Sequence, residues 1–247
     1  MSTVELTNRS DRPEPTLRGV DPAQRAAARL AGFLYLFTNI TAGLAFYVRS
    51  QLMVRGDAVQ TARNFAASER SLRIAIVTEL VTVACVLMLV AALYVVLKPI
   101  SNGVALVAAF WRLSENFVLA VITLSEFAAL ALLNADSANA FDTKQLQALW
   151  HTLFRVYGAG FNVGFVFLGL GSTVFSYLWF KSRYIPRVLA AWGIFSSLVL
   201  AIFSLAIMVS PGLAGVVGMA YMGPMGLYEM GLGLWLLVKG LRVSIAE

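Results

Sequence analysis

Six long apolar runs constrain the fold of this chain more than any other feature of its sequence. They cover residues 29–48, 73–97, 103–133, 152–180, 186–209 and 217–239. A helix needs about 20 apolar residues to cross the roughly 30 Å hydrocarbon core of a bilayer, and every run reaches that length. The runs therefore predict an all-α integral membrane bundle of six transmembrane helices.

The amount and distribution of charge agree with a membrane protein and exclude other classes. Only 13% of the 247 residues are charged and 59% are hydrophobic, whereas soluble domains have about 25% charged residues. The high apolar fraction also excludes intrinsic disorder. Most lysines and arginines flank the apolar runs, so we attribute the net charge of +6 to orientation in the lipid bilayer and expect no nucleic-acid binding.

Cysteine and histidine are too scarce for several kinds of functional site. Cys85 has no cysteine partner for an internal disulfide, and His151 is the only histidine. A histidine cluster that binds zinc, copper or haem is therefore impossible. The sequence also lacks a phosphate-binding loop, a dinucleotide-binding fingerprint and a hydrolase nucleophile elbow. We expect no metal and no cofactor.

The segments outside the apolar runs indicate the domain organisation and the orientation. Residues 1–22 are polar and contain three prolines, which predicts a disordered tail before a single transmembrane domain over residues 29–240. In residues 50–72, Asp57 is a candidate N-cap before an apolar face at helical spacing, which predicts a short helix on the membrane surface; a solvated loop is the alternative. Lysine and arginine are more frequent on the side of the termini, which predicts that both termini are cytoplasmic.

Charged side chains also occur well inside the apolar runs: Glu79, Arg112, Glu115, Glu126, Arg155 and Glu229. Each costs at least about 2.5 kcal/mol near the bilayer centre, so we expect them to face the bundle interior and to pair. At a rise of about 1.5 Å per residue, an inner layer near the midplane contains Arg112, Glu115, Glu229 and Asn39. An outer layer contains Glu79, Glu126, Arg155, Tyr157 and Asn162, under a roof of Trp150 and His151.

Residue spacing places three of these charges on one face of the third apolar run. Arg112 and Glu115 are three residues apart, and Glu126 follows eleven residues later, which is about three helical turns. We therefore expect this helix at the centre of the bundle. Glycines of the fourth and sixth runs predict close helix packing: Gly158, Gly160, Gly164, Gly226, Gly231 and Gly233.

The charges inside the runs do not balance. Four glutamates and two arginines leave a net charge of −2 if all are ionised. Because an unpaired buried carboxylate is very unfavourable, we expect at least one glutamate to be protonated at neutral pH. A neutral buried carboxylic acid can donate a proton, and such groups concentrate at functional sites. The alternative is that Arg112–Glu115 and Arg155–Glu126 are structural ion pairs that fix the helix register.

Several short motifs resemble a known family. They include Arg112-Leu113-Ser114-Glu115, Ser182-Arg183-Tyr184-Ile185-Pro186-Arg187-Val188-Leu189, and an ending from Glu229 through Leu234-Trp235-Leu236-Leu237-Val238-Lys239-Gly240. Through them the chain resembles a bacterial multipass membrane family that is catalogued only as a domain of unknown function. The resemblance implies a six-helix protein of the inner (plasma) membrane and makes Arg112, Glu115 and Glu229 part of the family pattern. It implies no activity.

From these residues we expect a membrane-embedded enzyme that acts by glutamate general acid/base chemistry on a lipophilic small molecule, an isoprenoid or lipid, in a cyclase or isomerase reaction. The candidate catalytic residues are Glu115, Glu229 and Glu79. The candidate substrate-binding residues are Arg112, Asn39, Trp111, Tyr35 and Tyr228. Two alternatives remain open: a small proton-coupled transporter that uses the same glutamates as protonation sites, and a non-catalytic membrane sensor or partner subunit.

Overall fold

The computed structural model describes residues 20–54, 58–132 and 143–242, and these residues are helical, with no strand among them. The elements are α1 (Pro22–Leu52), α2 (Ala58–Ala67), α3 (Glu69–Leu97), α4 (Asn102–Ala131), α6 (Thr143–Ser182), α7 (Arg187–Val209), α8 (Leu213–Val217), the 3-10 turn η1 (Ala220–Met222) and α9 (Gly223–Val238). Five helices are long and apolar enough to cross a membrane, namely α1, α3, α4, α7 and the part Ala148–Ser182 of α6. The chain is therefore an all-α, multipass membrane protein.

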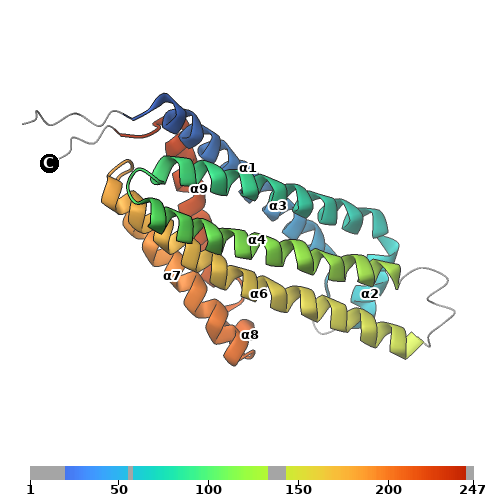
Figure 1. Ribbon diagram of the computed structural model, residues 1–247. Helices are drawn as coiled ribbons and strands as arrows, with labels where there is room; N and C mark the ends of the chain where they lie inside the picture. The colour runs from blue at the N-terminus through green and yellow to red at the C-terminus, as the bar shows by residue number, and fades with distance from the viewer. Residues whose placement is uncertain (1–19, 55–57, 133–142, 243–247) are drawn as a thin grey trace, which may run out of the picture.

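The long helices lie side by side (Figure 1), and their contacts close into a ring. α1 packs against α3, α3 against α4, α4 against α6, α6 against α7, and α7 against α9, which returns to α1. α8, which follows α7, lies partway along α6 in Figure 1, while α4 and α6 continue beyond it. One part of the molecule consequently contains the whole ring, and the far part consists of α1, α3, α4 and α6 together with α2.

The sixth apolar run is divided rather than continuous. The sequence predicts one span over residues 217–239, whereas the structure distributes this region over the end of α8, η1 and α9. Gly218 follows α8 with a φ of 56°, a left-handed conformation that glycine adopts without steric cost. Pro224 lies in the first turn of α9, where its missing N–H has no helical partner to lose. α9 is 16 residues long, which corresponds to about 24 Å of helix.

α1 begins earlier and ends later than the first apolar run. At its start, Asp21 and Gln24 form a capping box, and the Asp21 side chain accepts a hydrogen bond from the backbone N–H of Ala23 at 3.2 Å. Gln24 Nε2 also donates to the carbonyl of Val96 at 3.0 Å, which ties α1 to α3. Because α1 continues to Leu52, Arg49 lies inside the helix instead of flanking a span.

A helix forms between the first two spans, as Asp57 and the following residues predict. Phe65 of α2 is completely buried, and its ring centroid lies 5.2 Å from that of Trp150 and 4.7 Å from that of Phe154, both on α6. A hydrophobic cluster closes the far end of the bundle; it consists of Phe65, Leu72, Ile76, Ala129, Leu130 and Trp150. Asp57 itself and residues 1–19 of the predicted tail lie outside the described residues.

Small residues bring neighbouring helices together at three of the six predicted glycines. A Cβ atom on Gly160 would lie 2.2 Å from Ile122 Cγ2, and one on Gly233 would lie 3.0 Å from Tyr35 Cβ. Gly164 is in similar contact with α4, whereas Gly231 makes only ordinary contact and Gly158 and Gly226 have open space beside them. The close contacts lie on the α4–α6 and α1–α9 seams, which are the seams that hold the candidate site.

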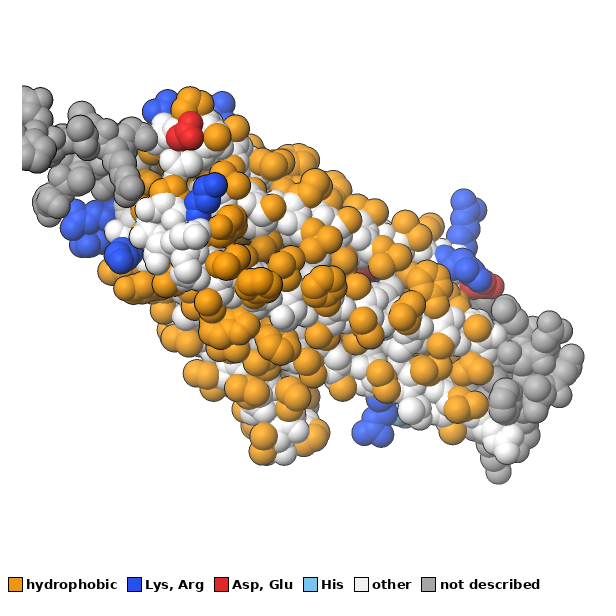
Figure 2. Space-filling view, in the orientation of Figure 1, with side chains coloured by type: hydrophobic (Ala, Val, Ile, Leu, Met, Phe, Trp, Pro, Cys, Tyr) orange, Lys and Arg blue, Asp and Glu red, His pale blue; other side chains and the backbone are white. Residues whose placement is uncertain are grey.

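The outer surface of the bundle is apolar along most of its length. Hydrophobic side chains cover the visible face in Figure 2, and lysines and arginines gather chiefly at its two ends. Exposed large residues occur on every long helix, for example Phe33 on α1, Phe117 on α4 and Leu227 on α9. Such a surface is stable in contact with lipid and not with water.

Candidate functional site

The inner layer of polar residues is assembled by α1, α4 and α9. We call Tyr35, Asn39, Arg112, Glu115, Tyr228 and Glu229 the inner cluster. Nη1 of Arg112 lies 2.8 Å from Oε2 of Glu115, one turn away on α4. Asn39 Nδ2 donates to Oε2 of Glu229 at 3.2 Å and so joins α1 to α9. Arg112 also interacts electrostatically with Glu229, although the carboxyl group that it pairs with directly is that of Glu115.

Burial is uneven within the inner cluster. Tyr35, Arg112, Glu115 and Tyr228 are each at most 4% exposed. Asn39 and Glu229 are only half-buried. The cluster is therefore closed on the side of α4 and partly open at the seam between α1 and α9.

Several buried polar atoms of this region make no hydrogen bond within the protein. They are Nε and Nη1 of Arg112, Oε2 of Glu115 and Oδ1 of Asn116. Nη1 of Arg112 and Oε2 of Glu115 are nevertheless ion-paired with each other at 2.8 Å. A buried donor or acceptor without a partner costs about 1–3 kcal/mol. The inner cluster therefore has unused hydrogen-bonding capacity at the guanidinium and at one carboxyl.

Glycines and a serine of α6 and α7 hold the inner cluster in place. A Cβ atom on Gly171 would lie 2.8 Å from Cγ of Arg112 and 3.0 Å from the carbonyl oxygen of Ala108, so only glycine lets α6 approach α4 here. The Tyr228 ring packs against Gly193, and its hydroxyl accepts a hydrogen bond from Ser176 Oγ at 2.9 Å. The sequence patterns did not point to Gly171, Gly193 or Ser176.

A second group of charges lies farther along the same bundle, where α1, α3, α4 and α6 each contribute one residue. We call Arg49, Glu79, Glu126 and Tyr157 the outer cluster. Nε and Nη2 of Arg49 donate to the two oxygens of Glu126 at 2.7 and 2.6 Å, and Nη2 also donates to Oε2 of Glu79. The Tyr157 hydroxyl donates to the same Glu79 oxygen at 2.7 Å. The guanidinium lies 5.0 Å from the centre of the Tyr157 ring.

The partner of Glu126 is Arg49, so the predicted Arg155–Glu126 pair is wrong. Arg155 is exposed on α6, whereas Arg49 is 6% exposed. The error arises from the end of α1, because Arg49 directly follows an apolar run that the prediction ends at residue 48. A signal was available: Tyr35, Thr38, Ala45 and Arg49 are buried at spacings of three, seven and four residues, a continuous interior face of α1.

The remaining predicted residues lie in several environments. Trp111 is half-buried beside Arg112, and Glu79 lies in the outer cluster, apart from Glu115 and Glu229. Asn162 accepts a hydrogen bond from the Tyr221 hydroxyl at 3.2 Å. Trp150 is buried, whereas His151 is exposed and forms no part of a buried roof. Arg112, Glu115 and Glu126 are all buried on α4, in agreement with the predicted stripe.

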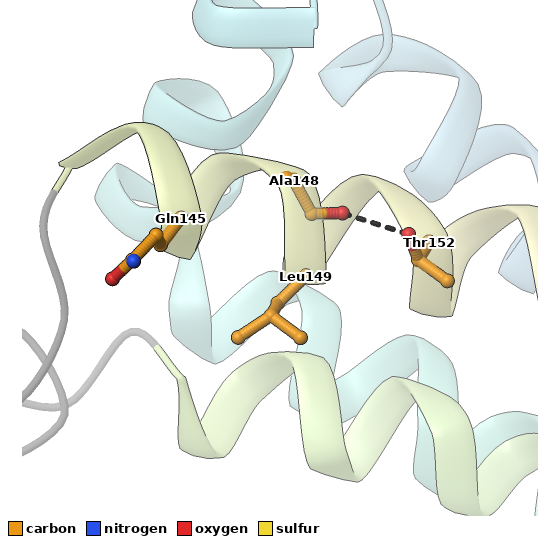
Figure 3. Close-up of a pocket in the computed structure, with 4 residues that line it drawn as sticks. All are labelled: Gln145, Ala148, Leu149 and Thr152. Carbon is orange, nitrogen blue, oxygen red and sulfur yellow. Dashed lines mark hydrogen bonds between the residues drawn. The ribbon is translucent and has the colours of Figure 1, made fainter.

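Two hollows in the described part of the chain lie away from both clusters. One is lined by Gln145, Ala148, Leu149 and Thr152 of α6, and Figure 3 shows the Thr152 hydroxyl bonded to the Ala148 carbonyl, a distance of 2.8 Å. A second hollow, next to the start of α1 and the end of α3, is lined by residues that include Gln24, Lys98 and Tyr184. Neither hollow gathers acid/base groups of the kind that the inner cluster contains.

No group of three or more histidine, cysteine, aspartate or glutamate side chains that could hold a metal ion occurs in residues 20–54, 58–132 and 143–242. The chemistry that the arrangement offers is therefore that of carboxyl groups, hydroxyl groups and two buried guanidinium groups. These groups can exchange protons and can bind the oxygen atoms of a ligand.

Comparison with known proteins identifies a family but no activity. The model of the family described as "Domain of unknown function (DUF4386)" matches residues 30–240, which include both clusters. This match confirms the resemblance to a family of unknown function. The comparisons with curated proteins and with solved structures find no match.

Proposed function

We propose that this chain, which belongs to the DUF4386 family, is a membrane-embedded enzyme that performs glutamate acid/base chemistry on a lipophilic small molecule. The observation that supports this proposal is the unused hydrogen-bonding capacity of Arg112 and Glu115 in the buried inner cluster. An oxygen atom of a substrate, such as a hydroxyl, carbonyl or carboxylate oxygen, would accept hydrogen bonds from Arg112. Such binding would remove the cost of the unpaired donors.

The two glutamates of the inner cluster supply the acid and the base. Two carboxylates facing one guanidinium leave one negative charge in excess, and an uncompensated charge is very unfavourable in a dry interior. One glutamate is therefore neutral and can donate a proton, while the other is ionised and can accept one. In an isomerisation, the acid protonates one carbon of a double bond, which leaves a cation on the other carbon, and the base removes a proton from the next carbon beyond that cation, so the double bond moves by one position. The substrate keeps its proton count, and transfer between Glu115 and Glu229 restores the starting state.

The other residues of the site position these groups. Asn39 donates a hydrogen bond to Oε2 of Glu229, and Oε1 of Glu229 would then bind the substrate. Tyr35 and Tyr228 provide buried aromatic surface, and Trp111 provides half-buried surface, against which an isoprenoid or lipid chain can pack. Because Asn39 and Glu229 are the partly exposed members of the cluster, we infer that the substrate arrives from the bilayer at the seam of α1 and α9.

We further propose that α9 is a short sixth span and that both termini lie in the cytoplasm of a bacterial cell, with the bundle in the inner membrane. Exposed basic residues support this orientation, because they gather in the connections and ends on one side: Lys98, Lys181, Arg183, Arg187, Lys239 and Arg242. An even number of spans returns the chain to the side from which it started.

The test uses the full-length protein purified in lipid nanodiscs. Native mass spectrometry first identifies lipophilic molecules that remain bound, and the same molecules and a panel of isoprenoids then serve as substrates. We expect Glu115→Gln and Glu229→Gln each to lower turnover about 100-fold or more, the usual contribution of a general acid or base. Glu69→Gln, at an exposed position of α3, is the matched control and should leave turnover unchanged. If both inner variants convert the substrate as fast as the native protein does, the proposal is overturned.

A proton-coupled transporter is the second candidate, and the outer cluster is the observation that favours it. Glu126 follows Glu115 by eleven residues on α4, so the two carboxyl groups are about 16 Å apart along one helix. Carboxyl groups at two levels of one bundle are the residue type that proton relays use, and in the outer cluster Glu79 would carry the proton beside the ionised Arg49–Glu126 pair. Vesicles with an internal pH dye test this candidate: proton movement that both Glu126→Gln and Glu229→Gln abolish would support transport. If neither turnover nor flux depends on these residues, the ion pairs serve packing alone.

A further inference from the structure

The outer cluster is asymmetric in how its two carboxyl groups are bonded. Glu126 receives a hydrogen bond on each oxygen, both from Arg49. Oε2 of Glu79 accepts two hydrogen bonds, one from Arg49 and one from Tyr157. Its Oε1 atom is buried and accepts no hydrogen bond. One carboxyl group is therefore fully engaged and the other has a free oxygen inside the bundle.

Charged and polar groups face Glu79 from three of the four helices that pack around it. α1 contributes Arg49, α4 contributes Glu126 and α6 contributes the Tyr157 hydroxyl. α2 also packs against α3, and Phe65 is its buried side chain there, while its Arg63 is exposed. Arg155 and His151 of α6 are exposed too. With Glu79 and Glu126 both ionised, the outer cluster has one negative charge that no cation balances.

We propose that the outer cluster is a proton-binding site in which Glu79 carries an exchangeable proton on Oε1, while Arg49 and Glu126 remain an ionised pair. A two-point guanidinium–carboxylate contact is the strongest arrangement of these groups, so Glu126 keeps its charge. Oε2 of Glu79 already accepts two donors, which leaves Oε1 as the atom that gains the proton. The proton comes from water at the far end of the bundle, and its uptake changes the charge of the cluster from −1 to zero.

Neutralisation is favourable here because the site is nearly dry. The side chain of Glu79 is 8% exposed and that of Glu126 is completely buried. An unbonded O–H group on Oε1 costs about as much as one missing hydrogen bond, whereas an unbalanced charge in a medium of low dielectric constant costs several times more. This site is separate from the inner cluster, so the proposal does not depend on the enzymatic function.

Infrared spectroscopy of the full-length protein in nanodiscs tests the proposal, because a protonated carboxyl group absorbs apart from a carboxylate. We expect Glu79→Gln to remove the carboxylic-acid signal of one group per chain. Glutamine has the shape of the protonated acid, so this variant should fold as the native protein does. Glu69→Gln, the exposed glutamate on the same helix, should remove no such signal. A signal that is unchanged in Glu79→Gln would overturn the proposal.

Two further variants check the charge balance of the outer cluster, and Tyr157→Phe assigns the proton to Glu79 rather than to Glu126. In Glu126→Gln, Glu79 becomes the only carboxylate beside Arg49, so it should ionise and its signal should disappear. In Arg49→Gln, both carboxylates lose their cation, so the acid signal should increase by one group. Should Glu79→Gln fail to fold, the native signal must shift in Tyr157→Phe, which removes a donor to Glu79 alone; no shift contradicts the assignment.

Two controls distinguish a proton on Glu79 from a bound metal cation and from a proton in the inner cluster. Replacing choline chloride by sodium chloride should leave the signal unchanged, and a loss of signal in sodium alone would show that a metal cation binds instead of a proton. Glu115→Gln and Glu229→Gln change the inner cluster alone. They should remove the acid signal of that cluster and leave the signal of Glu79 in place. The result for Glu79→Gln therefore stands even if the inner cluster proves inactive.

Discussion

The inner and outer clusters contain the same charged groups and differ in how their arginines are bonded. In each, two glutamates face one buried arginine. Arg49 binds both outer carboxyl groups through Nε and Nη2, whereas Nε and Nη1 of Arg112 complete no hydrogen bond. The outer cluster also joins four long helices, whereas the inner cluster includes the short helix α9. Equal composition thus gives an arginine that bonds to both carboxyl groups at one level and an incompletely bonded arginine, suited to a ligand, at the other.

The largest expected effect is the loss of Arg49, which tests whether the outer cluster is the structural one. Arg49→Ala leaves two buried carboxyl groups without a cation, and removing one partner of a buried pair typically costs about 3–5 kcal/mol. The loss should shrink at low pH, because protonation of Glu126 removes the charge that has lost its cation. Unfolding experiments in detergent micelles measure the free energy of unfolding of the native protein and of the variant. Arg155→Ala, at an exposed position, should change it by less than about 0.5 kcal/mol. An equal loss in both variants contradicts the pairing described above.

A smaller effect is expected from closing the space beside the inner arginine. Gly171→Ala places a Cβ atom within 3.0 Å of both Arg112 and the backbone of α4, so α4 and α6 must separate. We expect a loss of stability of about 1–3 kcal/mol and a loss of any turnover that depends on Arg112. Gly158→Ala on the same helix has open space at its Cβ position, and should gain about 0.5–1 kcal/mol from helix propensity. Unfolding measurements on both variants separate packing from propensity; an unperturbed Gly171→Ala would show that this seam is not tight.

The sequence predicts the all-helical, multipass character of the chain because long apolar runs and charges within them are strong, local signals. The stripe of Arg112, Glu115 and Glu126 follows directly from helical spacing, and the structure confirms it. Arg49 was missed because hydropathy locates the end of an apolar run and not the end of a helix. α1 continues beyond the apolar residues, and the contacts that Arg49 makes there stabilise this extension. The partners are Glu79 and Glu126, which are 30 and 77 positions away in the chain.

The division of the sixth run was missed for a related reason. Hydropathy averages over Gly218 and Pro224, although both favour a break in the helix. Likewise, the role of Gly171 depends on which helix lies opposite, and neighbours around the ring cannot be read from one sequence. Long-range partners therefore account for most of the differences, while local patterns account for the agreement.

The smallest expected effect compares the two clusters through the loss of one tyrosine hydroxyl group in each. Tyr157→Phe removes the donor to Glu79, and Tyr228→Phe removes the acceptor of Ser176. If Glu79 is neutral, both bonds join uncharged groups, and each variant should lose about 1 kcal/mol in denaturant unfolding. A bond to an ionised carboxylate is worth about 1.5–3 kcal/mol, so a clearly larger loss in Tyr157→Phe would mean that Glu79 is charged and carries no proton. Tyr177→Phe, at a position of α6 that is 51% exposed, provides the baseline. Equal losses in the two buried variants are what a protonated Glu79 requires.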